Sequence, residues 1–138
     1  MATFTADSLR SVLTASAIVW PARPFKGEPT YHSSYQHLRA VRVSVSGASG
    51  AFWTTDGTML ARLTVPLVDR ADEPFEIIIG AASVKRLLRL SEKLPYGSTI
   101  SIAADRSARI GKALRWKIPL PRGDVRLPGG EACVLVFP

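Results

Sequence analysis

The chain has 138 residues, 46% of them hydrophobic, which is enough for one domain with a substantial core but too short for two. Lys and Arg number 18 against 11 Asp and Glu, so the formal net charge is +7, which fits an anionic partner such as nucleic acid or a membrane surface. A single cysteine, Cys133, excludes a disulfide framework and a thiolate metal site. No window approaches the length of a membrane span, and the first residues lack a signal-peptide pattern. We therefore expect one cytoplasmic domain over residues 1–138.

The first segment predicts a short strand at Phe4 followed by a helix that ends before Pro21. Thr5 or Asp7 is placed to cap this helix. Its apolar positions are Leu9, Val12, Leu13 and Ser16. Residues 21–37 then form an irregular connector, which is long for a compact domain.

Alternating apolar and polar residues predict the strands that follow. We expect strands at residues 41–46, 51–55, 59–65, 75–79, 100–102, 114–120 and 132–137. The inward positions are expected to be Val41, Val43 and Val45; Met59, Ala61, Leu63 and Val65; and Leu114, Trp116, Ile118 and Leu120. Hairpin-length connections favour antiparallel pairing, so the predicted class is α+β, mainly antiparallel sheet with two helices packed on one face. Each half of the chain carries one helix followed by hairpins.

The second helix is predicted over residues 83–94 and has one apolar and one basic side. The apolar side holds Val84, Leu87, Leu88, Ser91 and Leu94. The other side holds Lys85, Arg86, Arg89 and Lys93, with Glu92 as the only acid among them. A row of cations opposite a buried stripe can lie along a polyanion such as nucleic acid. The alternative is a solvated surface helix that happens to be basic.

A second basic set comprises Arg106, Arg109, Lys112, Arg115, Lys117, Arg122 and Arg126. Arg115 and Lys117 alternate with the apolar positions of one strand, so we expect them to project from the opposite face of the sheet. Single members of this set are expected to be ordinary solubilising surface. Trp20, Trp53 and Trp116 are expected to be core or interface anchors.

Catalytic patterns are not found in the sequence. His32 and His37 lie in the connector without a nearby cysteine, a poor arrangement for zinc, and Cys133 lies in an apolar strand. The sequence has no Gly-x-Ser-x-Gly elbow, and its carboxylates are dispersed among turns and caps. The stretch at residues 47–50 joins two strands, so it predicts a hairpin turn and not a phosphate loop. We expect no enzymatic activity, no cofactor and no metal.

One motif indicates a family. The run Thr-Thr-Asp-Gly-Thr-Met-Leu-Ala at residues 54–61, followed by the strand at 75–79 and the basic helix, resembles one domain of the bacterial DNA sliding clamp, the beta subunit of the replicative polymerase. Thr58 and Met59 stand where the family usually has His-Arg, and the connector at 21–37 is longer. The family's chain carries three such domains, whereas the resemblance here covers one.

The resemblance implies a processivity or tethering factor that contacts duplex DNA without reading its sequence. The implied DNA-binding residues are Lys85, Arg86, Arg89 and Lys93, supported by Arg10 from the first helix. The implied partners are duplex DNA, replication or repair proteins such as a DNA polymerase, and further copies of the chain, with about six domains in a ring and no membrane. Edge strands such as residues 132–137 are expected to pair between subunits. Two alternatives stay open: a protein-interaction module of clamp-like fold that binds a partner through an apolar groove or sheet edge, and a small enzyme whose site has no recognisable pattern.

Overall fold

The computed structural model describes residues 1–20, 39–56 and 59–121. The first half contains β1 (Ala2–Thr5), α1 (Ala6–Val19), β2 (Ala40–Ser46), β3 (Ser49–Thr55) and β4 (Leu60–Pro66). The second half repeats this order with β5 (Phe75–Gly80), α2 (Ala81–Glu92), β6 (Thr99–Ile102), β7 (Ser107–Ile110) and β8 (Leu114–Lys117). The rhythm of one helix followed by hairpins in each half is thus confirmed.

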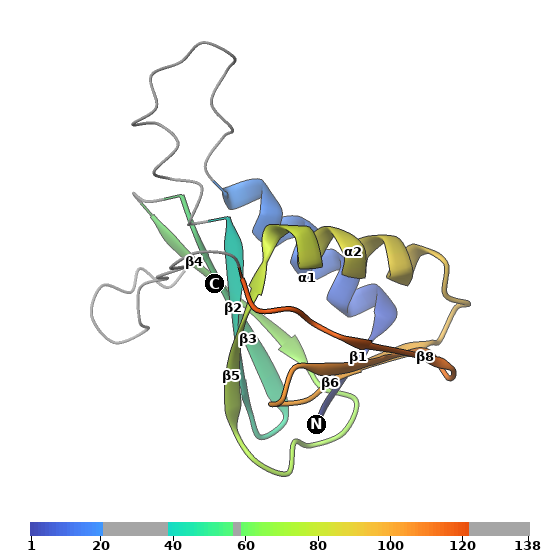
Figure 1. Ribbon diagram of the computed structural model, residues 1–138. Coiled ribbons are helices and arrows are strands. Elements are labelled where there is room, and N and C mark those ends of the chain that lie inside the picture. Colours follow the sequence, from blue (N-terminus) through green and yellow to red (C-terminus); the bar gives the residue numbers. More distant parts are fainter. Residues whose placement is uncertain (21–38, 57–58, 122–138) are drawn as a thin grey trace.

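The strands divide between two antiparallel sheets, and α1 and α2 pack against each other beside them (Figure 1). One sheet has the order β4-β3-β2-β5, which we call sheet B, and the other has the order β1-β6-β7-β8, which we call sheet A. Each sheet takes three strands from one half of the chain and the first strand of the other half. The α+β class, the antiparallel pairing and the two helices are confirmed, but the hairpin pattern did not predict the division into two sheets.

The helices begin and end for identifiable local reasons. Thr5 caps α1, because its Oγ1 accepts a hydrogen bond from the main-chain N–H of Ser8 at 3.1 Å. The helix ends at Val19, and its C-cap Trp20 directly precedes Pro21. Gly80 precedes α2 without a side-chain cap. This helix begins two residues earlier than the sequence pattern predicts and ends at residue 92.

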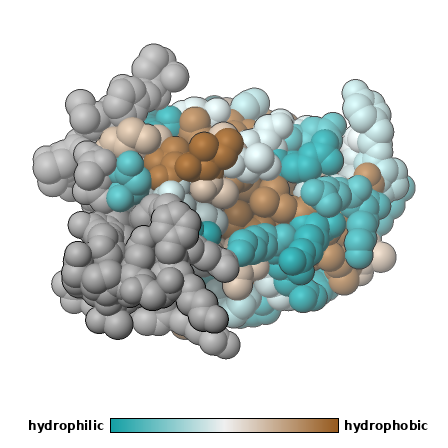
Figure 2. Space-filling model, turned by 90° about the horizontal axis from the view of Figure 1, so that it is seen from above, coloured by the Kyte–Doolittle hydropathy of each residue, from teal (hydrophilic) through white to brown (hydrophobic). Residues whose placement is uncertain are grey.

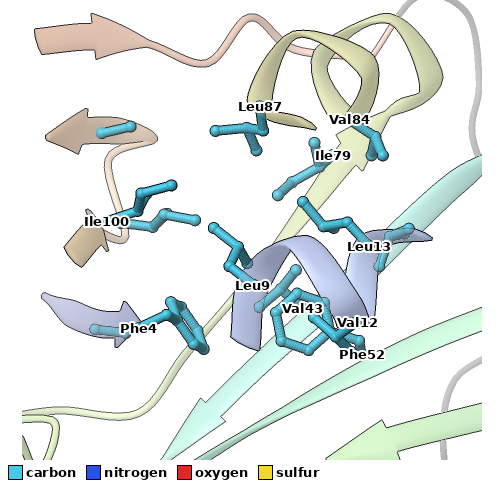
Figure 3. Packing of buried hydrophobic residues seen from close by; sticks show 14 of the residues in the cluster. Phe4, Leu9, Val12, Leu13, Val43, Phe52, Ile79, Val84, Leu87 and Ile100 are labelled. Atoms are coloured by element: carbon cyan, nitrogen blue, oxygen red, sulfur yellow. The ribbon is translucent and has the colours of Figure 1, made fainter. Parts of the chain in front are cut away.

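Both helices and both sheets contribute to one apolar core (Figure 3). Phe4 of β1 and Phe52 of β3 meet edge to face, with ring centroids 5.6 Å apart. Leu9 of α1 and Leu87 of α2 are fully buried in the same cluster. The inward positions predicted for β2, Val41, Val43 and Val45, are confirmed as buried.

Two strand predictions were wrong in detail. At the start of β4 the alternation is reversed, since Met59 is 41% exposed and Leu60 is 5% exposed. Met59 belongs to the turn, where its N–H donates to Asp56 Oδ1 and its carbonyl accepts from the Thr55 hydroxyl.

The last described strand also differs from its prediction. β8 ends at Lys117, and of the four positions expected to point inward only Ile118, just beyond the strand, is buried. Leu114 and Leu120 are exposed and Trp116 is half-buried. β8 is the outer strand of sheet A, so fewer side chains cover it. Strand β7 was not predicted, and the expected strand at 132–137 lies outside the described residues.

Candidate nucleic-acid interface

Helix α2 is amphipathic in the way its sequence predicts. Ser83, Val84, Leu87 and Ser91 are buried, whereas Lys85, Arg86, Arg89 and Lys93 are exposed. Glu92 is exposed as well, so the exposed charges of this segment are four positive and one negative. Leu88 and Leu94 lie between the two sides and are half-buried. The cations therefore cover the solvent side of a helix that the core fixes on its other side.

Arg86 differs from its three basic neighbours because it contacts the sheet. Its guanidinium lies over the Trp116 ring of β8, 5.2 Å from the ring centroid. The side chains of Lys85, Arg89 and Lys93 have no ion pair or hydrogen bond with any other described residue. Three of the four cations on α2 are thus available to an external anion, and the fourth is positioned by an aromatic contact that the sequence did not predict.

Arg10, the supporting cation on α1, is already paired. Its Nη2 lies 3.0 Å from Asp7 Oδ1 one turn earlier, and both side chains are partly exposed. The positive charge of Arg10 is therefore offset within α1. The spacing of three residues between an acid and a base on a predicted helix is a signal that the sequence alone contained.

The side of the molecule that carries the helices is visible in Figure 2, which is seen from above Figure 1. Hydrophilic residues gather on one part of this surface, with hydrophobic residues exposed between them. One of the exposed apolar side chains of α1 is Ile18, which is 78% exposed. The helix side thus exposes both hydrophilic and hydrophobic residues.

Perturbed titratable groups in the structure belong to structural contacts. Hydrogen bonds from Arg42, at 2.7 and 2.8 Å, and from Ser44 hold the pKa of Glu76 below its ordinary value. The main-chain N–H of Ser107 lowers the pKa of Asp105, and burial lowers the pKa of Arg106. Each of these shifts is therefore accounted for by hydrogen bonds within the fold or by burial.

The described part of the chain has no group of three or more His, Cys, Asp or Glu side chains that could hold a metal ion. The two histidines, His32 and His37, and the cysteine, Cys133, lie outside the described residues. No helix among the described elements is long and apolar enough to cross a membrane.

The outer edges of the two sheets are not equivalent. The β1 edge is covered, because Val68 N–H donates to Thr3 O at 2.8 Å, and Arg106 contacts the β5 edge at Ile78 O. Within residues 1–20, 39–56 and 59–121, β4 and β8 have no hydrogen-bonded strand on their outer sides. They lie on opposite sides of the molecule in Figure 1. As far as the described residues go, each therefore has main-chain groups with which a partner strand could pair.

A groove of about 770 Å³ runs between α1 and the open strand β4. Asp7, Ser8 and Ser11 line it on the helix side together with Val12 and Ala15, and residues 62–66 line it on the strand side. The groove combines apolar walls with main-chain groups at a sheet edge. Such a surface can hold an extended segment of another chain.

Solved structures share this arrangement of helices and sheets. A Caulobacter crescentus pol III beta matches with a TM-score of 0.66 over 94% of this chain, at 23% sequence identity. The chain has the fold of one sliding-clamp domain. The DNA polymerase III subunit beta of Pseudomonas aeruginosa matches over 97% of the chain, with a TM-score of 0.64 and 20% identity. The Thermotoga maritima beta subunit gives a TM-score of 0.62 over 93% at 14% identity.

This clamp-like chain spans about a third of the length of the clamp structures it matches, 32% in each of these three comparisons. No protein-family model matches the sequence, and no curated protein matches it. The resemblance inferred from residues 54–61 and the elements after them is thus confirmed at the level of the fold.

Proposed function

We propose that this chain is a non-catalytic DNA-tethering protein of the sliding-clamp fold, which contacts the phosphates of duplex DNA through α2. The observation that carries the proposal is the row of exposed cations opposite the buried stripe of α2. Lys85, Arg89 and Lys93 have no internal partner in the described chain, and the fold around them is that of clamps. Duplex DNA presents a matching row of negative charges.

The chemistry of this helix favours phosphate contact over base recognition. Its exposed side chains are mainly Lys and Arg, and it carries no Asn or Gln to form paired hydrogen bonds with base edges. Three phosphate contacts would give a slope of about −2.7 for log K against log salt concentration. Binding is therefore expected to be independent of sequence and strongly weakened by salt.

Ring assembly is the second part of the proposal. The chain spans about a third of a clamp chain, and the family resemblance implies a ring of about six such domains, so about six copies would form a clamp-like ring. The open strands β4 and β8 support a head-to-tail contact, in which β4 of one copy pairs with β8 of the next. Closed cyclic symmetry would leave no open edge. A ring of this kind would hold replication or repair proteins such as a DNA polymerase near DNA.

The experiment compares two variants with the same change in charge. R89A/K93A removes two cations of α2, and the control R70A/K112A removes two exposed cations elsewhere. On a closed circular duplex, the salt slope should fall by about 1.8 for the α2 variant and stay constant for the control. Equal slopes for the two variants would contradict DNA contact through α2.

The ring is tested separately by mass in solution and by DNA topology. A hexamer of the 14.9 kDa chain should remain on circular DNA and slide off short linear duplexes unless their ends are blocked. A strictly monomeric mass at high concentration would exclude the ring and leave a DNA-contacting monomer.

The groove between α1 and β4 favours a second candidate function, a protein-interaction module of the same fold. In this case an extended partner segment adds to the β4 edge and places side chains in the groove. Monomeric mass together with DNA binding that is insensitive to R89A/K93A would favour the module over the tether.

A further inference from the structure

The outer face of sheet A carries a second set of cations, remote from the solvent side of α2. Ala108 and Ile110 of β7 are buried, so Arg109 between them projects outward. Trp116 of β8 lies under Arg86 of α2, which places its neighbours Arg115 and Lys117 on the side away from the helix. This agrees with the side that strand alternation predicts for these two cations.

The strand register places two of these cations directly opposite each other. Arg109 of β7 pairs with Arg115 of β8, and in the same row Arg109 pairs with Ser101 of β6. Like charges at directly opposed positions of an antiparallel pair are unfavourable. Neither guanidinium has an ion pair or hydrogen bond with the described residues. The face thus keeps a repulsion that a bound anion would relieve.

One acid lies near this set. Asp105 accepts a hydrogen bond from Ser107 N–H at 2.9 Å and interacts electrostatically with Lys117. It offsets part of the Lys117 charge, and no acid of the described ranges forms an ion pair with either arginine.

The cations surround a shallow hollow of about 320 Å³. It is lined by Met1, residues 107–109 of β7 and residues 115–117 of β8, and by no residue of α2. Guanidinium groups present a planar fork of donors that matches the two oxygens of a carboxylate. Two such forks side by side, with Lys117 two residues along the strand, fit an extended chain carrying carboxylates at alternate positions.

We propose that this hollow, the sheet A hollow, binds an extended acidic segment of a partner protein. The proposal does not depend on DNA contact by α2, because the two surfaces lie on different sides of sheet A. It also holds whether or not the chain forms a ring.

Several features favour a peptide over nucleic acid as the occupant. Among the residues that the structure describes, the cations of this face lie on β7 and β8, and the same row continues on β6 and β1 with Ser101 and Thr3, whose hydroxyls are hydrogen-bonded to each other at 2.9 Å. A row of cations that covers two strands is short for a surface that follows the phosphates of a nucleic acid. Single-stranded nucleic acid is commonly held by stacking on aromatic side chains, and the aromatic residue of these strands, Trp116, lies toward α2.

The test uses three labelled probes: a ten-residue peptide of alternating Glu and Ser, a 20-nucleotide oligo-dT and a short duplex. Two full-length variants with equal loss of charge are compared, R109S/R115S in the sheet A hollow and R89A/K93A on α2. R109S/R115S should weaken peptide binding about tenfold or more, as expected for losing paired charged hydrogen bonds, and leave duplex binding within about twofold. R89A/K93A should leave peptide binding within about twofold.

Three results would overturn the proposal. Peptide binding unchanged in R109S/R115S would mean that the hollow is not the site. Equal weakening by both variants would mean that the peptide responds to net charge alone. Oligo-dT that binds more tightly than the peptide, and depends on Arg109 and Arg115, would make the hollow a nucleic-acid surface. Thermal unfolding of each variant, with R115S alone as a milder change, verifies that the protein is folded. Loss of duplex binding to α2 is measured independently and tests only the tethering proposal.

Discussion

Arg106 connects the two sheets, and replacing it should destabilise the fold substantially. Its Nη2 donates to Ile78 O of β5 at 2.6 Å and to Pro119 O at 2.8 Å, and its Nε donates to Ile118 O at 3.0 Å. R106A leaves two part-buried carbonyls and one exposed carbonyl without this donor. At about 1–1.5 kcal/mol for each part-buried carbonyl, the expected loss is about 2–3 kcal/mol in the free energy of unfolding.

The backbone conformation of Arg106 provides a second test, because it separates the loss of hydrogen bonds from the strain of a non-glycine residue at this position. Arg106 has a φ of 73°, in the left-handed region that favours glycine. R106G should therefore lose the same hydrogen bonds but recover about 1 kcal/mol relative to R106A. The assay is urea unfolding followed by circular dichroism, with thermal unfolding in parallel. R106A is expected to lower Tm by about 6–12 °C in a chain of this size.

R106K supplies a further control, because it keeps the charge without the planar fork. It should fall between R106A and the parent protein. A loss below about 0.5 kcal/mol for R106A, the range of ordinary surface changes, would refute the role of Arg106 as a link between the sheets.

Three further predictions concern packing and pH. G50A places a methyl group 3.1 Å from the fully buried ring of Phe4, so it should cost about 1–3 kcal/mol in urea unfolding, and a neutral effect would show that the ring can shift. L87A removes a fully buried side chain between α2 and the sheets and should cost about 2–5 kcal/mol; a cost below 1 kcal/mol would contradict its burial. Arg42 lowers the pKa of folded Glu76, so this pair stabilises the protein above the ordinary glutamate pKa and loses its effect as pH falls through the lowered value. E76Q, at a half-exposed site, should cost up to about 1 kcal/mol at pH 7 and almost nothing near pH 2; an equal cost at both values would refute the linkage.

Local patterns in the sequence determined the main elements of this protein. The 3.6-residue periodicity predicted α2 with its basic side, and the two-residue alternation predicted the buried side of β2. Thr5 was one of two caps proposed for α1. These features follow from residues close in sequence, whose side chains share one side of a helix or one side of a strand whatever their distant neighbours are. The motif at 54–61 and the order of elements also led to the sliding-clamp fold.

Long-range contacts decided which of the predicted residues are available for binding. All four α2 cations have the same helical pattern, yet Arg86 rests on Trp116 because β8 passes that part of the helix. The half-buried position of Trp116, which the alternation predicted as core, follows from the place of β8 at the sheet edge. Arg10 differs from both cases, because the three-residue spacing between Asp7 and Arg10 in the sequence is sufficient to suggest their ion pair.

The division into two sheets came only from the tertiary structure. A hairpin pattern predicts that neighbouring strands pair. It does not predict where one sheet ends, because both halves of the chain contain the same order of elements. The exchange of β1 and β5 between the halves joins residues about 100 positions apart, such as Ala2 and Ile102. Only the burial of both sheets against one pair of helices fixes that exchange. The placement of Arg109 opposite Arg115, by contrast, is set by the short turn at residues 111–113 that joins β7 to β8.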